Sequence, residues 1–288
     1  MNDSIKLIEC PRDAMQGILT WIPTEVKIAY INHLLTVGFD TVDFGSFVSE
    51  KAVPQLKDTA QVLRALDLTH AKSKLLAIVA NVRGAEDAAN FDEIAYLGFP
   101  FSISETFQKR NTNKSIEESL FQVEEIQNLC VQHRKELVIY ISMGFGNPYG
   151  DPYSPDYVTG WCERLYNELG ISILALSDTI GAATPEGIAP LFKTLIHSLP
   201  KVEFGAHLHT IAGQANEKIE AAWNAGCRRF DGAIRGFGGC PMASDQLTGN
   251  MPTEELVRFC MEKGIDHHMD TGLFQQAMSM ALTVFPNH

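Results

Sequence analysis

Two histidines separated by one residue are the first candidates for chemistry in this sequence. His207 and His209 lie in the run GAHLHT, where a predicted β-strand over residues 203–207 ends. Residues i and i+2 of a strand point to the same face, so both imidazoles can converge on one point. Two unrelated polar histidines at a strand end are the alternative. If this strand belongs to a barrel of alternating strands and helices, its carboxyl end is where an active site would lie, and there we favour a metal site.

A metal ion needs further ligands, and the sequence offers two oxygen donors. Asp13 follows the first predicted strand, and Asn250 follows the last. Oxygen and nitrogen donors without a thiolate suit a divalent cation such as Mg²⁺, Mn²⁺ or Zn²⁺ and do not choose among them. The structural alternatives are a salt bridge between Asp13 and Arg12, and a helix cap by Asn250.

A glycine-rich run, GFGGCP at 236–241, carries Cys240. Three glycines in five residues predict a flexible loop. A thiol in such a loop is partly exposed, unlike a cysteine packed in the core. Cys240 could act as an acid, a base or a nucleophile, or its thiol could be incidental. The other five cysteines lie in strand or helix patterns and are predicted to pack in the core.

Other polar side chains follow predicted strands. Arg12 adjoins Asp13, so its guanidinium could face a substrate oxygen. Asp43, Ser142 and Asp178 lie at the ends of the second, fifth and sixth predicted strands. Each could instead serve only in a turn, but several charged groups at strand ends of one sheet favour a shared site.

The main local basic patch follows the fourth predicted strand. It comprises Lys109, Arg110 and Lys114, with Asn111 and Asn113 among them. A basic rim on an acidic protein suits the phosphates of a small-molecule tail, and a solvated loop is the alternative.

Short apolar segments alternate with longer amphipathic ones along the chain. The predicted strands are residues 5–9, 41–44, 75–79, 98–103, 137–142, 173–177, 203–207 and 229–233. The predicted helices are residues 24–37, 115–131, 155–169, 184–199, 215–225 and 252–263. Ser115 and Glu118 form a predicted capping box. Most strands are apolar on both faces, as in a parallel sheet covered by helices.

Eight strand–helix units of about 36 residues each predict a (β/α)₈ TIM barrel of the α/β class. We expect one domain over residues 1–288, with the barrel at about 5–265 and a short C-terminal helical tail at about 266–288. A doubly wound sheet would usually carry G-x-G-x-x-G after its first strand, where this chain has Pro-Arg-Asp. The active site of a TIM barrel lies at the carboxyl ends of its strands.

Composition argues against several classes of protein. The 23 Lys and Arg against 35 Asp and Glu give a net charge of −12 with no basic stripe, which argues against nucleic-acid binding. No stretch of 18 apolar residues predicts a membrane span. The first ten residues lack the features of a signal peptide, and the six scattered cysteines form no C-x-x-C. We therefore expect a cytoplasmic protein with free thiols.

Longer motifs carry a family resemblance over about residues 5–265. They are PRDAMQ, SFVSEKAVPQL, SETFQKRNTNKSIEES, SDTIGAATP, the His-x-His pair, GFGGCP and GNMPTEELV. With these motifs the chain resembles the 3-hydroxy-3-methylglutaryl-CoA lyase family of metal-dependent DRE-TIM lyases. The combination of GGCP with the long motif after the fourth strand is more specific than any one motif.

The resemblance implies cleavage of 3-hydroxy-3-methylglutaryl-CoA to acetyl-CoA and acetoacetate, in leucine catabolism, by a homodimer. It implies a divalent metal, Mg²⁺ or Mn²⁺ ahead of Zn²⁺, on Asp13, His207, His209 and Asn250. Arg12 would stabilise enolate charge and Cys240 would take part in proton transfer, with Asp43 and Asp178 as further catalytic residues. The implied contacts to the acyl-CoA come from Gln16, Ser142, Thr179, Lys109, Arg110 and Asn111.

Four segments depart from the family pattern. Asp43 stands where the family has Glu, and GILTWIPT follows Gln16 where the family has Asn-Glu-Lys. TIAG follows His209 in place of Asp-Thr-Tyr-Gly, and Phe145 with NPYG replaces a Cys with Pro-Tyr-Glu-Gly. The implied ligands and Cys240 are retained, so the reaction class is better supported than the acyl group.

Two other functions compete with this reading. One is a lyase or condensing enzyme of the same group that acts on a different 3-hydroxyacyl-CoA or on a 2-oxo acid. Condensing relatives commonly add C-terminal domains, and GGCP favours the lyase branch. The other is a paralogue that binds a CoA ester without turnover, against which the retained ligands and Cys240 argue.

Overall fold

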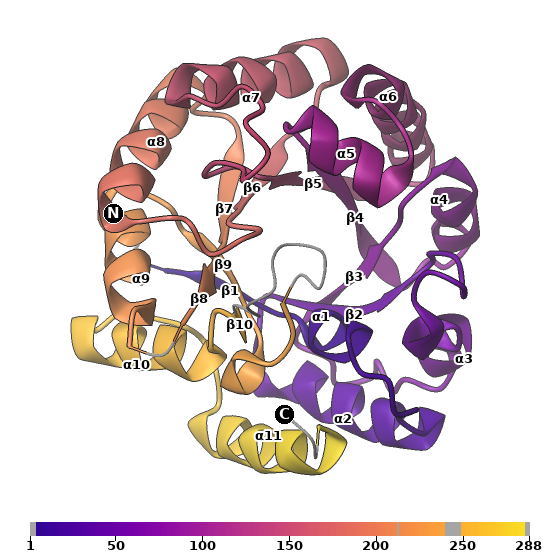
Figure 1. Ribbon diagram of the computed structural model, residues 1–288. Helices are drawn as coiled ribbons and strands as arrows, with labels where there is room; N and C mark the ends of the chain where they lie inside the picture. Colours follow the sequence, from indigo (N-terminus) through magenta and orange to yellow (C-terminus); the bar gives the residue numbers. More distant parts are fainter. Residues whose placement is uncertain (1–3, 212, 240–248, 286–288) are drawn as a thin grey trace.

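Eight parallel strands close into a barrel ringed by helices (Figure 1). The computed structural model describes residues 4–211, 213–239 and 249–285. The barrel strands are β1 (Lys6–Glu9), β2 (Thr41–Ser46), β3 (Lys74–Ile78), β4 (Ile94–Ser102), β5 (Glu136–Ser142), β6 (Ile173–Ser177), β7 (Glu203–His207) and β9 (Arg229–Gly232). The predicted TIM barrel is confirmed.

The helix ends follow local chemistry. α2 (Thr24–Val37) stops at Gly38, whose φ of 110° is disfavoured for other residues. α6 (Ile116–Gln132) begins with the predicted capping box of Ser115 and Glu118. The other helices are α1 (Pro11–Gln16), α3 (Thr59–Arg64), α4 (Val82–Ala89), α5 (Glu105–Thr112), α7 (Pro155–Leu169), α8 (Pro185–Ser198), α9 (Ala215–Asn224), α10 (Thr253–Lys263) and α11 (Thr271–Val284), with 3-10 turns η1 (Pro54–Leu56) and η2 (Ile234–Gly236).

Short elements and strand ends differ most from the prediction. Helices α1, α3, α4 and α5 were not expected, because six to eight residues give too few turns for a clear hydrophobic period. The expectation that Asp43 ends its strand is wrong. β2 continues to Ser46, and a register irregularity between Asp43 and Gly45 lets it stay paired with β3. Asp43 is therefore buried within the strand.

The strands bury an apolar cluster in one part of the sheet and charged groups in another. The apolar cluster comes from β3 to β6 and comprises Leu76, Ile78, Tyr96, Val138, Tyr140, Ile173 and Ala175. The buried ionisable groups include Glu9 on β1, Asp43 on β2, and Arg229 and Asp231 on β9. Because β2 and β9 flank β1, these groups lie on and around the strand that leads into α1.

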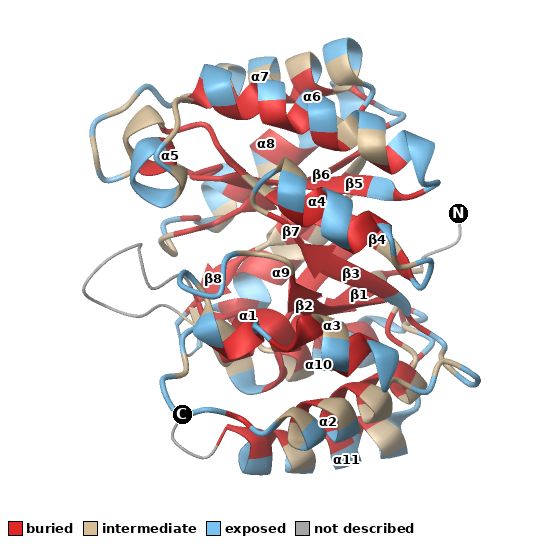
Figure 2. Cartoon of the chain, turned by 90° about the vertical axis from the view of Figure 1, so that its right-hand side faces the viewer, coloured by how far each residue is buried: buried red, intermediate tan, exposed pale blue. Residues whose placement is uncertain are grey.

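Polar segments gather at one end of the barrel. α1, α5 and a two-stranded antiparallel pair lie there, on the left of Figure 2. The pair joins β8 (His209–Thr210) to β10 (Gly249–Asn250). The predicted helical tail is present as α11, which lies beside α2 in both views, with Phe274 edge-on to Phe39 at 6.3 Å. No helix in the described part of the chain is long and apolar enough to cross a membrane.

Candidate active site

The two histidines and Asp13 converge at the mouth of the barrel. His207 ends β7 and His209 starts β8, with their ring centroids 5.5 Å apart. Asp13, on the first turn of α1, faces them, with its Oδ2 3.8 Å from His207 Nε2. One ligand atom from each of the three residues lies within 4.8 Å of the others. Both rings converge as expected, although Leu208 separates β7 from β8, so the two histidines do not belong to one strand.

Hydrogen bonds orient both rings toward this point. His207 Nδ1 lies 3.1 Å from Asp231 Oδ2, and His209 Nδ1 lies 3.2 Å from the carbonyl oxygen of Thr179. Because a carbonyl can only accept, His209 Nδ1 must carry the proton, which leaves Nε2 with a free lone pair. His209 Nε2 is buried and has no hydrogen-bond partner among the described residues. Metal-binding histidines are typically oriented in this way, by a carboxylate or carbonyl on the other ring nitrogen.

Asn250 completes the candidate ligand set. It pairs with His209 across the β8–β10 ladder, so the two side chains are neighbours. Its Nδ2 donates to the carbonyl oxygen of Phe237 at 2.8 Å, and its side chain also hydrogen-bonds Asp13. With the amide nitrogen so engaged, Oδ1 is the atom that can face a cation. Asn250 does not cap α10, whose N-cap residue is Pro252. Two imidazoles, a carboxylate and an amide oxygen form a donor set that fits a divalent cation.

The electrostatics keep two of these ligands in the form that binds metal. Burial raises the pKa of Asp13, but the Arg12 guanidinium and the two histidines outweigh it, so the net pKa is lowered. Burial, together with His207, lowers the pKa of His209 to about 4. Burial also lowers the pKa of His207, but Asp231 and Asp13 outweigh it and leave the net pKa raised. At neutral pH Asp13 is therefore anionic and His209 is neutral, as metal binding requires.

Arg12 is held by acceptors on three of its nitrogens. Its Nε and one terminal nitrogen donate to Asp43 Oδ2 at 2.9 and 2.5 Å. The other terminal nitrogen donates to Asp13 at 3.0 Å and to Gln16 at 2.9 Å. The salt bridge between Arg12 and Asp13 is thus formed, and both residues also line the cavity described next. Burial raises the pKa of Asp43 to about 6 despite the neighbouring guanidinium.

A cavity of about 480 Å³ opens over these groups. That volume is within the usual range for a small-molecule site. Most of the predicted site residues share its lining: Arg12, Asp13, Gln16, Asn111, Ser142, Thr179, His207 and His209. The structure therefore brings together residues from β1, β4, β5, β6 and β7 units that lie far apart in the sequence.

Some predicted residues lie elsewhere. Asp178 is buried and forms an ion pair with Lys218 at 3.0 Å. It also accepts a hydrogen bond from the Ala183 amide. It is not among the described residues that line the cavity. Lys109 and Arg110 are exposed on α5, where Lys109 pairs with Glu105 at 2.8 Å. Arg110 lies over the Tyr149 ring, 4.7 Å from its centroid.

Cys240 lies outside the described residues. The prediction that the other five cysteines are core residues agrees with their burial as free thiols.

Two residues that the sequence analysis did not single out support the site. Asp231 orients His207, and an Asp within the predicted strand over residues 229–233 was the available signal. Lys218 donates to Asp178 and, at 2.8 Å, to the His209 carbonyl oxygen, so it fixes the backbone at the second histidine. Nothing in the sequence marks Lys218, because its place on α9 is typical of a solvent-exposed lysine.

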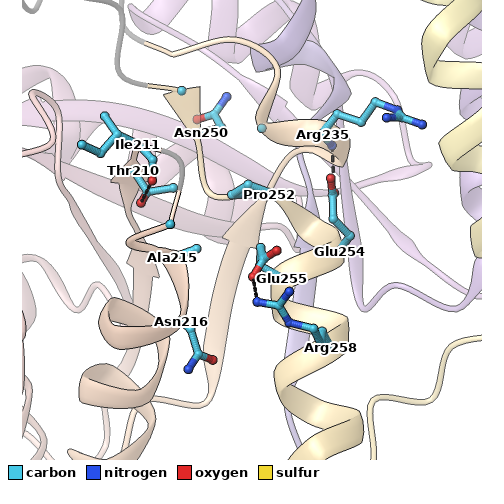
Figure 3. Close-up of a pocket in the computed structure, with 13 residues that line it drawn as sticks. Thr210, Ile211, Ala215, Asn216, Arg235, Asn250, Pro252, Glu254, Glu255 and Arg258 are labelled. Atoms are coloured by element: carbon cyan, nitrogen blue, oxygen red, sulfur yellow. Dashed lines mark hydrogen bonds and ion pairs between the residues drawn. The ribbon is translucent and has the colours of Figure 1, made fainter.

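A second cavity of about 610 Å³ lies on the other side of the β8–β10 pair, with Asn250 on its wall (Figure 3). The charged side chains around it have partners within the protein, and Arg235 Nε donates to the Met278 carbonyl oxygen at 3.3 Å. Arg258 pairs with Glu255, and Glu254 accepts a hydrogen bond from the Arg235 amide at 2.9 Å. This cavity therefore shows no charged group directed at a ligand among the residues described.

Comparison with known proteins identifies the family. A family model described as HMGL-like matches residues 5–281. The rat protein named 3-hydroxy-3-methylglutaryl-CoA lyase, cytoplasmic, is 33% identical over 283 residues, which cover 95% of this chain and 81% of that protein. The HMG-CoA lyase structure from Bacillus subtilis matches with a TM-score of 0.91 at 31% identity, covering 98% of this chain and 95% of that one.

A second solved structure adds a bound ligand. An HMG-CoA lyase from Acinetobacter baumannii, in complex with coenzyme A and 3-methylmalate, matches with a TM-score of 0.89 at 31% identity. The match covers 99% of this chain and 92% of that chain. Together, the barrel, the convergent site and these matches establish that the chain is a lyase of the HMGL-like family.

Proposed function

We propose that this lyase cleaves 3-hydroxy-3-methylglutaryl-CoA to acetyl-CoA and acetoacetate with a divalent metal. The observation that carries the proposal is the convergence of Asp13, His207 and His209 in one cavity with Arg12. Relatives named 3-hydroxy-3-methylglutaryl-CoA lyase, about one-third identical over most of the chain, support the choice of substrate.

The cation would be held by Asp13, His207, His209 and Asn250. When bound, a divalent metal supplies Lewis-acid chemistry that lowers the cost of ionising the substrate's C3 hydroxyl. The protein contributes a preset arrangement of the ligands. Asp231 and Thr179 fix the two rings, and Asn250 is tied to Asp13 and to the Phe237 carbonyl.

Arg12 would neutralise the charge that develops as the C2–C3 bond breaks. Cleavage leaves an electron pair on the acetyl-CoA fragment, whose enolate oxygen needs a nearby positive charge. The Arg12 guanidinium lines the cavity, and Asp43 holds its Nε edge. Asp43 is buried beneath the cavity, so its proposed role is to position Arg12. The ion pair of Asp178 with Lys218 likewise supports a positioning role for Asp178.

The acetyl-CoA carbanion must then receive a proton. We assign this transfer to Cys240 on the basis of the family resemblance and its place in GFGGCP. The start of this run supports the assignment, because Gly238 packs directly against the backbone of Asp13 and the side chain of Asn250.

The acyl-CoA substrate would lie between the ligands and α5. Gln16, Ser142, Thr179 and Asn111 line the cavity, and we assign them to the acyl and pantetheine portions. Lys109 and Arg110 lie near its rim on the same helix as Asn111 and would attract the CoA phosphates. The Acinetobacter baumannii lyase solved with coenzyme A supports this class of ligand.

The remaining features of the proposal rest on the resemblance. The metal would be Mg²⁺ or Mn²⁺, with Zn²⁺ as the third choice, because an O/N donor set accepts all three. The assembly would be a homodimer, the compartment the cytoplasm and the pathway leucine catabolism. The cytoplasmic rat relative supports the compartment.

Product analysis tests the proposal. Purified protein with Mg²⁺ or Mn²⁺ should convert 3-hydroxy-3-methylglutaryl-CoA to equal amounts of acetyl-CoA and acetoacetate. His207→Ala should abolish the reaction. Absence of turnover with either metal would contradict the named substrate.

A further inference from the structure

One wall of the cavity is formed by apolar side chains from β3, β4 and the segment after β2. In the strand order of the barrel, β3 and β4 lie across from β7 and β9. Ile78 at the end of β3, Ala80 just beyond it and Pro100 on β4 form its centre. The segment after β2 extends the wall with Val48, Ala52 and Val53. The ligand side, by contrast, carries Arg12, Asp13 and the two histidines.

The side chains of this wall include no donor that could bind a carboxylate, and the two unpartnered buried hydroxyls on the described lining, of Ser46 and Tyr140, are uncharged. Arg12 is the one Lys or Arg side chain on the described lining, and it follows β1 rather than β3 or β4. Its hydrogen-bonding nitrogens already donate to Asp43, Asp13 and Gln16. A charged substituent placed against the wall would lose hydration without gaining a partner, whereas an apolar one would gain by burial.

The wall is also larger than a methyl group needs. Ala52 is exposed, and Ala80, Pro100, Val48 and Val53 are each partly exposed to solvent. The small side chains of the two alanines leave room in front of them. A methyl substituent would leave most of this apolar surface exposed to water, and each further methylene would bury more of it.

We propose that this wall binds an apolar C3 substituent longer than methyl, so that the preferred substrate is a 3-hydroxy-3-alkylglutaryl-CoA. The inference rests on the proposed lyase function and names its substrate class. The C2–C3 bond breaks, the hydroxyl proton leaves as the C3 carbonyl forms, and a proton adds to C2. The products are acetyl-CoA and a 3-oxo acid that keeps the alkyl group, with no net change in protons or electrons.

A chain-length series tests the proposal. The substrates are 3-hydroxyglutaryl-CoA esters with methyl, ethyl, propyl and butyl groups at C3, each measured with saturating Mg²⁺. We expect kcat/KM to rise by roughly fourfold for each added methylene, since burial of a methylene favours binding to that extent. A value that falls from methyl to ethyl and onward would overturn the proposal. No turnover of any ester would instead refute the lyase function.

Filling the wall should reverse the preference. Ala80→Leu should lower the ratio of kcat/KM for the butyl ester to that for the methyl ester at least tenfold. Ala65→Leu is the matched control, because Ala65 is exposed at the end of α3 and is not part of the wall. If the wall instead holds the pantetheine arm, Ala80→Leu would weaken inhibition by free CoA and lower kcat/KM for all four esters equally. That result would contradict the proposal.

Discussion

At the residue scale, Glu9 is a buried acid that the proposed chemistry does not use. It ends β1, and its carboxyl group accepts hydrogen bonds from the Ile234 amide at 2.9 Å and the Thr253 hydroxyl at 2.6 Å. Burial raises its pKa to about 8, although both hydrogen bonds act in the other direction. Glu9 thus links β1 to the elements on both sides of the glycine-rich run.

This raised pKa predicts a pH-dependent stability. Between about pH 4.5 and 8 the unfolded chain loses the Glu9 proton while the folded chain keeps it, so this group makes the fold less stable as pH rises. Glu9→Gln mimics the protonated acid and removes the effect. The difference in free energy of unfolding, variant minus parent, should therefore increase by up to about 4 kcal/mol between pH 5 and pH 8. Urea unfolding at both pH values measures this, with exposed Glu86→Gln as control; an unchanged difference would refute it.

Asp43 allows a separate test of the Arg12 assignment. Asp43→Asn keeps the shape of the side chain but removes the charge that holds the guanidinium. We expect kcat to fall about 10- to 100-fold with a smaller change in KM, because transition-state stabilisation depends on the placement of Arg12. Asp40→Asn, immediately before the same strand, should change neither constant. Equal losses in the two variants would mean that Asp43 has only a structural role.

At the scale of elements, Gly238 joins the glycine-rich run to the ligand site. Its φ is +85°, and a Cβ there would lie 2.6 Å from the Asp13 carbonyl oxygen and 2.9 Å from Asn250 Nδ2. Gly238→Ala should therefore displace two candidate ligands, lower kcat at least tenfold and weaken Mn²⁺ binding. Gly187→Ala on α8 is the control, since its Cβ would meet nothing closer than 3.8 Å. Normal activity and metal affinity in Gly238→Ala would contradict the packing.

Elements with strong local signals were predictable from sequence, and those held by long-range contacts were not. The bounds of α2 and α7 agree residue for residue with the prediction, because Gly38 and Gly170 adopt positive φ and end the helices. α1 and α5 are too short for such a signal.

The candidate site was likewise predictable where a local pattern decides the geometry, and not where residues distant in the sequence meet. The alternation of one strand predicted the convergence of His207 and His209. The partner of Asp178 was not predictable, because Lys218 lies 40 residues away on a helix. The burial of Asp43 likewise depends on how far β2 continues, which local sequence does not specify.

At the scale of the whole molecule, a net charge of −12 opposes the approach of an anionic CoA ester. The exposed cations of α5 offer a local exception. Replacing Lys109 and Arg110 together by Gln should raise KM for the acyl-CoA about 3- to 10-fold at low ionic strength and leave kcat unchanged. Added salt should reduce the difference, because it screens exposed charges. Lys201→Gln, just before β7 at the other end of the barrel, is the control. An unchanged KM at low salt would place the CoA phosphates elsewhere.

The central claim is that Asp13, His207, His209 and Asn250 hold a divalent metal on which lyase activity depends. A Mn²⁺ titration of chelator-treated protein tests it directly, with bound Mn²⁺ measured by electron paramagnetic resonance and acetoacetate release measured in the same samples. The predicted result is one Mn²⁺ per chain, activity proportional to occupancy, and loss of both in His209→Ala. Full acetoacetate release without bound metal, or unchanged Mn²⁺ binding in His209→Ala, would contradict the claim.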